Sequence, residues 1–156
     1  MMKRAAVATL AFLAILHQPA SAQGELIGAW RTEFDIGIRS ENGVETSMGK
    51  RQATMTLTLK GDSVFGTWQV IVPEGGKAPP ALRLSGTRTG GKVTLQSEPV
   101  ERTVRMNDEE QQVKMITGYV FELSGDELRG TTRTWSADHA FDPPDRPFAA
   151  TRVKAQ

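Results

Sequence analysis

The fold of this chain is indicated by one stretch near its start, Gly28-Ala29-Trp30-Arg31-Thr32-Glu33-Phe34-Asp35-Ile36. Apolar or uncharged side chains occupy every second position from Trp30, and the charged residues Arg31, Glu33 and Asp35 occupy the positions between. Because successive side chains of a β-strand point to opposite faces, this alternation predicts a strand with one buried and one solvated face. It leaves open whether the buried face belongs to a packed core or to the wall of a ligand site.

The first 22 residues have the three parts of a secretory signal peptide. Lys3 and Arg4 give a positive start, residues 5–16 form an apolar run too short to span a bilayer, and small residues end the segment at Ala22. A buried N-terminal helix is the alternative interpretation. We expect cleavage after Ala22 and export to the periplasm or beyond. Residues 23–156 then have the length of a single domain with its own core.

Composition excludes several classes of function. Residues 1–22 hold two of the 19 Lys and Arg and none of the 18 Asp and Glu, so residues 23–156 carry 17 minus 18, or a net charge of −1. A chain without net positive charge gives no electrostatic case for nucleic acid. There is no Cys, and His139 is the one His besides His17. Thiol catalysis and metal sites built from several Cys or His are therefore excluded, and no cofactor is expected.

Period-two alternation recurs along the whole domain, with Gly and Asp at the turns between runs. It predicts an all-β fold with strands at 28–39, 50–60, 63–72, 81–88, 92–104, 111–123, 127–136 and 147–153. The longer links are 40–49, 73–80 and 137–147. Consecutive hairpins of similar length favour an eight-stranded antiparallel up-and-down barrel, because closure removes exposed strand edges. A sandwich of two sheets is the alternative.

A short pattern occurs twice in these strands. Residues 59–67 and 123–131 both fit L-x-G-D-x-[VL]-x-G-T, and residues 84–87 repeat its end. Each copy places a Gly inside a strand, where it is unfavourable unless the backbone bends or another chain segment approaches closely. Strongly coiled small barrels need such points. We interpret the repetition as similar hairpins.

The alternation also predicts which side chains face the interior. In the first half they are almost all apolar: Trp30, Phe34, Ile36, Ile38, Ala53, Met55, Leu57, Leu59, Val64, Trp68, Val70, Val72, Leu82 and Leu84. The later strands add Val93, Leu95, Met115, Tyr119, Phe121, Leu128, Phe148 and Ala150, and also the hydroxyls of Thr117, Thr132, Thr134 and Ser136. Buried hydroxyls need hydrogen-bond partners, which water, a ligand or one another can supply.

Two short motifs carry a resemblance to a known family. Gly28-Ala29-Trp30 opens the first strand as G-x-W, and Thr151-Arg152 lies on the last strand. The pair resembles the signature of lipocalin and calycin barrels, and the wider rhythm is similar to lipocalin-like domains of secreted bacterial proteins. The resemblance implies a barrel in which Trp30 packs beneath Arg152 at the closed end.

Candidate functional residues follow from this arrangement. Trp30 and Arg152 are expected to close the barrel, and a guanidinium on an indole contributes about 0.5–2 kcal/mol. The candidates for a ligand site in the lumen are Trp68, Met55, Met115, Thr117, Tyr119, Thr132, Thr134 and Arg88. For each of them a purely structural role in the core is the alternative.

The loop after the seventh strand is a weak candidate for a metal site. It contains Asp138, His139, Asp142 and Asp145, but Pro143 and Pro144 interrupt any ligand spacing typical of divalent cations. No nucleophile elbow accompanies His139, so no catalytic constellation is predicted. An outer-membrane barrel is excluded because the polar face carries Arg31, Glu33 and Asp35.

The sequence thus predicts a non-catalytic barrel that binds a small, mainly hydrophobic molecule. The alternative is a packed barrel that acts through its Pro-rich loops, 73–80 and 137–147, as an inhibitor or accessory domain.

Overall fold

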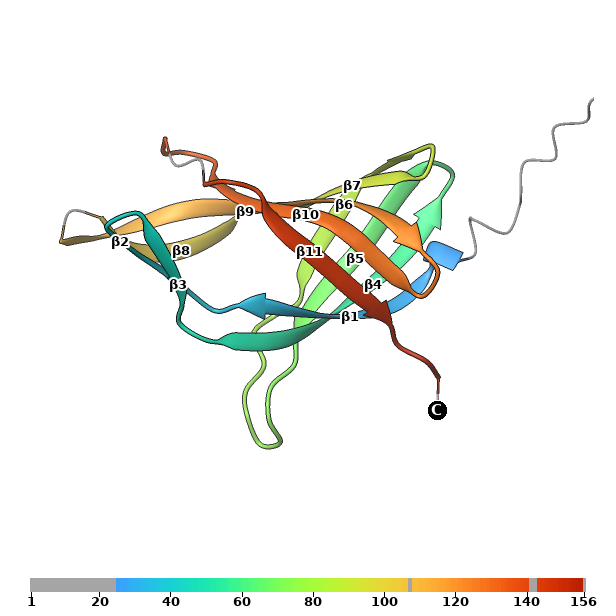
Figure 1. The fold of residues 1–156 in the computed structure, drawn as a ribbon, viewed down its shortest axis with the longest axis horizontal. Helices are drawn as coiled ribbons and strands as arrows, with labels where there is room; N and C mark the ends of the chain where they lie inside the picture. The colour runs from blue at the N-terminus through green and yellow to red at the C-terminus, as the bar shows by residue number, and fades with distance from the viewer. Residues whose placement is uncertain (1–24, 107, 141–142, 156) are drawn as a thin grey trace, which may run out of the picture.

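The computed structural model describes residues 25–106, 108–140 and 143–155. It is a closed eight-stranded antiparallel barrel formed by β1 (Gly28–Asp35), β4 (Lys50–Lys60), β5 (Ser63–Val70), β6 (Leu82–Thr89), β7 (Lys92–Ser97), β9 (Glu109–Ser124), β10 (Glu127–Ser136) and β11 (Arg146–Arg152) (Figure 1). Each strand pairs with the next, and β11 returns to pair with β1. The prediction of an up-and-down barrel is confirmed. The predicted signal peptide, 1–22, lies outside the described residues.

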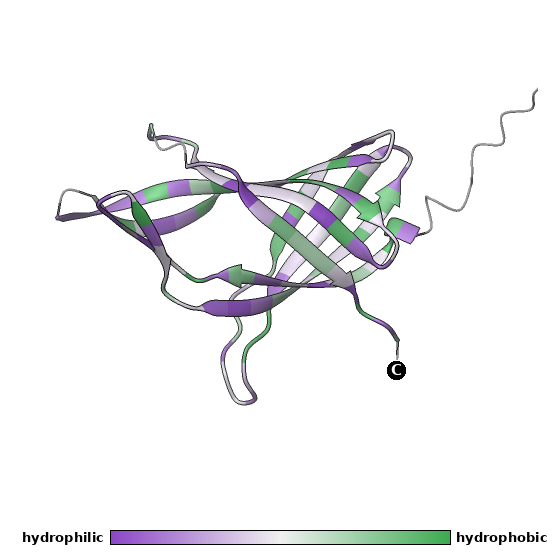
Figure 2. Ribbon diagram, viewed as in Figure 1, coloured by the Kyte–Doolittle hydropathy of each residue, from purple (hydrophilic) through white to green (hydrophobic). Residues whose placement is uncertain are grey.

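Alternating hydropathy puts the core inside the barrel. Figure 2 shows hydrophilic and hydrophobic residues alternating along the strands. Trp30, Met55, Leu57, Leu95 and Leu128 are completely buried, and the core also takes in Leu26 from just ahead of β1. Within the described residues, no helix is long and apolar enough to cross a membrane.

The predicted first strand, 28–39, and the predicted link, 40–49, were wrong in detail. β1 ends at Asp35, and β2 (Ile38–Glu41) and β3 (Val44–Ser47) form a separate hairpin beyond the barrel. Asn42 and Gly43 both have positive φ, 53° and 78°, as the tight turn of a hairpin requires. Because this hairpin extends past the core, Ile36 is 48% exposed instead of buried, and Ile38 is only half-buried.

The predicted strand 92–104 was also wrong in one respect, because it is two strands. β7 ends at Ser97, and β8 (Val100–Met106) begins after Pro99. Gln96 pairs with Gly118 of β9 and Val100 with Met115, so three residues of the first strand oppose two of its partner. This is the count of a β-bulge, and Pro99 suits it because proline has no N–H for a ladder bond. β8 and the first half of β9 form a ribbon that projects from the barrel (Figure 1).

The strand glycines lie where another backbone approaches closely, which confirms the prediction. A Cβ added to Gly86 would lie 1.8 Å from the carbonyl oxygen of Thr94, and one added to Gly130 would lie 1.9 Å from that of Val120. At Gly66 the oxygen of Thr56 would be 2.8 Å away. No side chain fits at such separations, so these glycines permit the tight coiling of the barrel.

We predict that Gly130→Ala lowers the free energy of unfolding by about 2 kcal/mol or more, because the added methyl group forces β9 and β10 apart. Gly91→Ala is the matched control, since an added Cβ there meets no atom within 4 Å and the backbone is not left-handed. It should change stability by less than about 0.5 kcal/mol. Urea unfolding of both variants measures the difference, and equal effects would contradict the role assigned to Gly130.

Candidate functional site

One end of the barrel is closed by Trp30 and Arg152. Their Cα atoms are direct partners between β1 and β11, and the guanidinium carbon of Arg152 lies 4.3 Å from the centroid of the Trp30 ring. The indole is completely buried, and its Nε1 donates to the carbonyl of Leu26 at 3.0 Å. This end of the barrel is therefore filled by an aromatic side chain under a cation.

The guanidinium of Arg152 also holds the chain ends together. It donates to the carbonyl of Glu25, to the carbonyl of Ile27 at 3.4 Å, and to the carboxylate of Asp126 at 3.1 Å. Asp126 belongs to the turn between β9 and β10, whereas the two carbonyls precede β1. A guanidinium suits this position because it is planar and has several N–H donors. It can donate to three acceptors in its plane while its face stays on the indole.

A layer of aromatic rings crosses the barrel above this closed end. Phe34 meets Trp68 edge-on at 5.5 Å between ring centroids, Trp68 stacks on Tyr119 at 5.4 Å, and Tyr119 meets Phe148 at 5.2 Å. The rings come from β1, β5, β9 and β11. We call Phe34, Trp68, Tyr119 and Phe148 the aromatic layer. Such contacts add about 0.5–1.5 kcal/mol per pair to the burial of the rings.

Exposure rises across this layer toward the open end. Below it, Met55, Leu57 and Leu95 are completely buried. Within it, Trp68 is 7% and Tyr119 5% exposed. Beyond it, the next inward residues are half-buried, and we call them the mouth residues: Val70, Met115, Thr117, Thr134 and Ser136. Most inward side chains toward the open end are therefore less completely buried than the core residues, although Val113 and Ser97 stay buried there, at 3% and 7% exposed.

The hydroxyls near the mouth find partners within the protein. Thr117 Oγ1 lies 3.0 Å from Thr134 Oγ1, and Thr132 Oγ1 donates to the carbonyl of Gly118 at 2.9 Å. Ser97 Oγ accepts from the backbone N–H of Thr117 at 3.0 Å. Of the three sources of partners that the sequence left open, namely water, a ligand and the protein itself, the protein supplies the partners of these hydroxyls.

Tyr119 differs from these hydroxyls. Among the described residues its phenol oxygen has no hydrogen-bond partner, and burial alone raises the pKa of the phenol above its ordinary value of 10. No described side-chain oxygen that is fully buried lacks a partner. The Tyr119 oxygen must therefore reach accessible space, although the residue as a whole is only 5% exposed. It is the polar group of the aromatic layer, and no described protein group bonds its hydroxyl.

Two of the predicted lumen residues lie away from the mouth. Met55 is completely buried below the aromatic layer, between Trp30 and Trp68 in strand register. Arg88 pairs with Val93 beside the β6–β7 turn, whereas Trp68 pairs with Leu82 at the opposite end of β6. Six residues of strand, about 20 Å, separate these two positions on β6. The structure brings together Trp68, Met115, Thr117, Tyr119, Thr132 and Thr134.

The loop after β10 is fixed at the mouth by a local network. Ser136 Oγ donates to Asp138 Oδ1 at 2.9 Å, and His139 Nδ1 lies 2.9 Å from the same oxygen. These contacts hold the pKa of Asp138 at about 2, with the bond to His139 as the largest cause. The carboxylate lies between hydroxyl and imidazole, whereas a nucleophilic triad has the imidazole between the other two.

The predicted metal loop lies only partly within the described residues. Asp138 and His139 are adjacent and in contact, Asp145 is exposed, and Asp142 lies outside the described residues. Within the described ranges, no group of three or more His, Asp or Glu side chains comes together.

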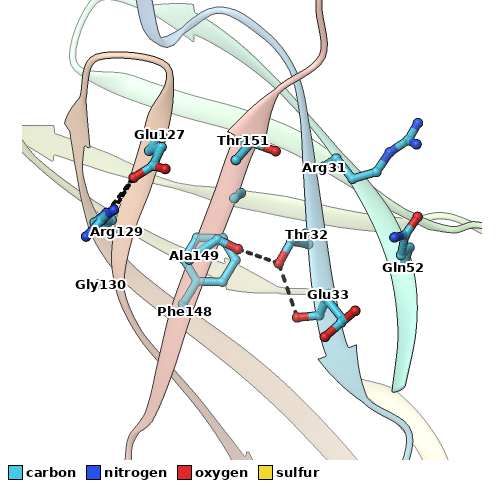
Figure 3. A pocket seen from close by; sticks show the side chains of 11 residues that line it. Arg31, Thr32, Glu33, Gln52, Glu127, Arg129, Gly130, Phe148, Ala149 and Thr151 are labelled. Atoms are coloured by element: carbon cyan, nitrogen blue, oxygen red, sulfur yellow. Dashed lines mark hydrogen bonds and ion pairs between the residues drawn. The ribbon is translucent and has the colours of Figure 1, made fainter. Parts of the chain in front are cut away.

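Sequence reasoning missed a groove of about 440 Å³ on the outer surface. It lies over β1, β10 and β11, with the small residues Gly130, Ala149 and Thr151 along it and Arg31, Glu33, Glu127 and Arg129 among its lining (Figure 3). Glu127 accepts from Arg129 Nε at 2.6 Å, and Glu33 pairs with Lys50 at 3.0 Å, which raises the pKa of Lys50.

The groove follows from the short seam between β1 and β11. These strands are in register over three positions, Trp30 to Thr32, while β1 continues along β4 to Asp35. Thr32 reaches across the seam to donate to the carbonyl of Ala149 at 2.7 Å. The small residues 149–151 were a signal in the sequence, but only the register shows that the strands part beside them.

The fold places the protein among closed eight-stranded antiparallel β-barrels. No family model and no curated protein matches the sequence. Among solved structures it is similar to one described as the crystal structure of Rv2717c from M. tuberculosis, with a TM-score of 0.44 and 14% identity over 86% of this chain and 96% of that chain. The lipocalin-like resemblance stays a prediction.

Proposed function

We propose that this protein is an exported, non-catalytic binding protein that holds a small, mainly apolar molecule at the open end of its barrel. The ligand rests on the aromatic layer among the mouth residues and makes one hydrogen bond to the Tyr119 hydroxyl. The observation that carries this proposal is the phenol oxygen of Tyr119, which lies in an otherwise apolar layer and bonds no other group among the described residues. Binding sites for small molecules are typically apolar with a few polar groups that fix orientation.

Three features support the open end as the place of binding. Trp68 and Tyr119 are 7% and 5% exposed, whereas Thr117 and Met115, nearer the open end, are half-buried. The hydroxyls beside Tyr119 are already paired, so they do not compete for its hydrogen bond. The opposite end is filled by Trp30 under Arg152, so a ligand would enter from the mouth.

Export is part of the same proposal, and it rests on the sequence of residues 1–22. The protein recovered from the periplasm or the medium of its host should begin at Gln23. Intact-mass spectrometry measures this directly. Recovery of the full chain from the cytoplasm alone would contradict export.

The second candidate function is protein interaction through the outer wall, and the groove over β1, β10 and β11 is the observation that favours it. A partner segment there would meet Arg31, for which no ion pair occurs among the described residues, together with the small residues Ala149 and Thr151. The two functions use opposite faces of the barrel wall, so one pair of variants separates them.

We predict that hydrophobic molecules carrying one oxygen, such as fatty acids and aromatic ketones, quench tryptophan fluorescence saturably at a ratio of one to one. Tyr119→Phe should weaken their binding about 5- to 10-fold, because it removes one hydrogen bond of about 1–1.5 kcal/mol. It should leave the affinity for matched hydrocarbons unchanged.

Arg31→Gln is the matched control for this titration, since it changes the outer groove and leaves the interior intact. It should have no effect on ligand affinity. Absence of saturable quenching across the panel would contradict ligand binding. Loss of binding in Arg31→Gln with normal binding in Tyr119→Phe would place the site in the groove instead.

A further inference from the structure

The free edge of β8 is the feature from which we infer an interaction. β8 pairs with β9 on one side and is the last strand in the sheet order. β2 and β3 form their own two-stranded sheet, and no described strand pairs with the other side of β8. An unpaired edge offers backbone N–H and C=O groups to another strand.

One face of the β8–β9 ribbon carries an ordered pattern of charge. Glu101, Thr103 and Arg105 of β8 lie opposite Lys114, Gln112 and Glu110 of β9. All six residues are exposed. Gln112 donates to Thr103 Oγ1 at 2.7 Å, and Arg105 Nε lies 3.9 Å from Asp108 Oδ1 in the turn. Each charged residue of this face of β8 therefore lies opposite a residue of the other sign across the ribbon.

We propose that β8 pairs with β8 of a second copy of this chain, antiparallel and centred on Thr103. In this register Glu101 lies opposite Arg105 of the second copy, and Arg105 lies opposite its Glu101. Two rows of facing residues, related by the two-fold axis, then cross the four strands, and the charges alternate in sign along each row. One row consists of Lys114, Glu101, Arg105 of the second copy and Glu110 of the second copy. Opposite charges at directly facing positions stabilise strand pairs.

The charge pattern of β8 favours this register, and it favours a second copy of the chain as the partner. Centring the pair on Arg102 instead would place that guanidinium opposite its own copy and would lose both pairs of Glu101 with Arg105. A two-fold axis at Thr103 forms the same contact twice, as in an isologous dimer. Antiparallel pairing also places the two barrels at opposite ends of the four-stranded ribbon, because β8 runs away from its barrel (Figure 1).

The contact is small, which makes the dimer weak. A seven-residue edge falls below the size of standard stable interfaces, so association depends on concentration and on salt. The alternative is that the charges of β8 only protect the edge from association, which is a common function of charged edge residues. The two explanations predict different effects of reversing the charge of Glu101 or Arg105. Reversal weakens the proposed dimer, whereas it has no dimer to weaken if the charges only protect the edge.

Sedimentation velocity of residues 23–156 over a series from low-micromolar to millimolar concentration tests the proposal. The wild-type protein should pass from monomer to dimer, and added salt should shift the equilibrium toward monomer. Glu101→Lys alone and Arg105→Glu alone should each weaken dimerisation about tenfold or more, because each places like charges opposite one another in both rows.

An equimolar mixture of Glu101→Lys and Arg105→Glu is the decisive sample. In the mixed dimer the two substituted positions face each other in one row with their charges exchanged, and the native Glu101 and Arg105 face each other in the other row. Opposite charges therefore meet at both contacts between the two copies, so dimerisation should return, to a level below the wild type because each substitution also faces a like charge, Lys114 or Glu110, across its own ribbon. Glu122→Lys is the matched control, since it reverses an exposed carboxylate of β9 beside β7, away from β8. It should dimerise like the wild type.

Circular dichroism and tryptophan fluorescence establish that each variant keeps the barrel fold. The salt series of the wild type gives a second readout should one variant fail to fold. A wild-type monomer across the whole series would overturn the proposal. So would dimers that both single variants leave unchanged, or a mixture that stays monomeric.

Discussion

The seam between β1 and β11 is the constraint on which the rest of the structure depends. It joins the first and last barrel strands over only three register positions, and two side chains reinforce it: Thr32, which donates to Ala149, and Arg152, which covers Trp30 and bonds the carbonyls ahead of β1. Without it the remaining strands would form an open sheet with two long edges. With the barrel closed, Trp30 and Arg152 fill one end, while Met115 and Thr117 toward the other end are half-buried, and the proposed ligand site is at that second end.

The fold could be predicted from the sequence where alternation and turn residues agreed, as in β4 and β10, whose predicted bounds are those of the structure. The fold could not be predicted from the sequence where a strand leaves the barrel. The hydrophobic pattern of Ile36 and Ile38 continues that of β1, although no core lies opposite them. The Asn42-Gly43 turn was a local signal for the missing hairpin. Pro99 marked the bulge, whereas the free edge of β8 depends on pairings that sequence alone does not give.

The candidate site was predictable in part for the same reason. Period two identifies Trp68, Thr117 and Tyr119 as inward residues, but not their height in the barrel, because height depends on the shear between strands. Arg88 is separated from Trp68 along β6, because Trp68 pairs with Leu82 at the other end of that strand, and Met55 is completely buried in the core. Hydrogen bonding decides the rest: Thr117 and Thr134 satisfy each other, and Tyr119 is left with an oxygen that a ligand could use. The outer groove arises where β1 and β11 part, which no residue pattern shows.

A double-mutant cycle between Trp30 and Arg152 tests the closing interaction most directly. Urea unfolding of Trp30→Leu, Arg152→Met and the double variant gives the coupling energy of the pair, free of the separate losses of each side chain. We predict a favourable coupling of about 0.5–2 kcal/mol, the range for a cation over an aromatic ring. A coupling indistinguishable from zero, with Arg152→Met as stable as the wild type, would show that barrel closure does not depend on this pair.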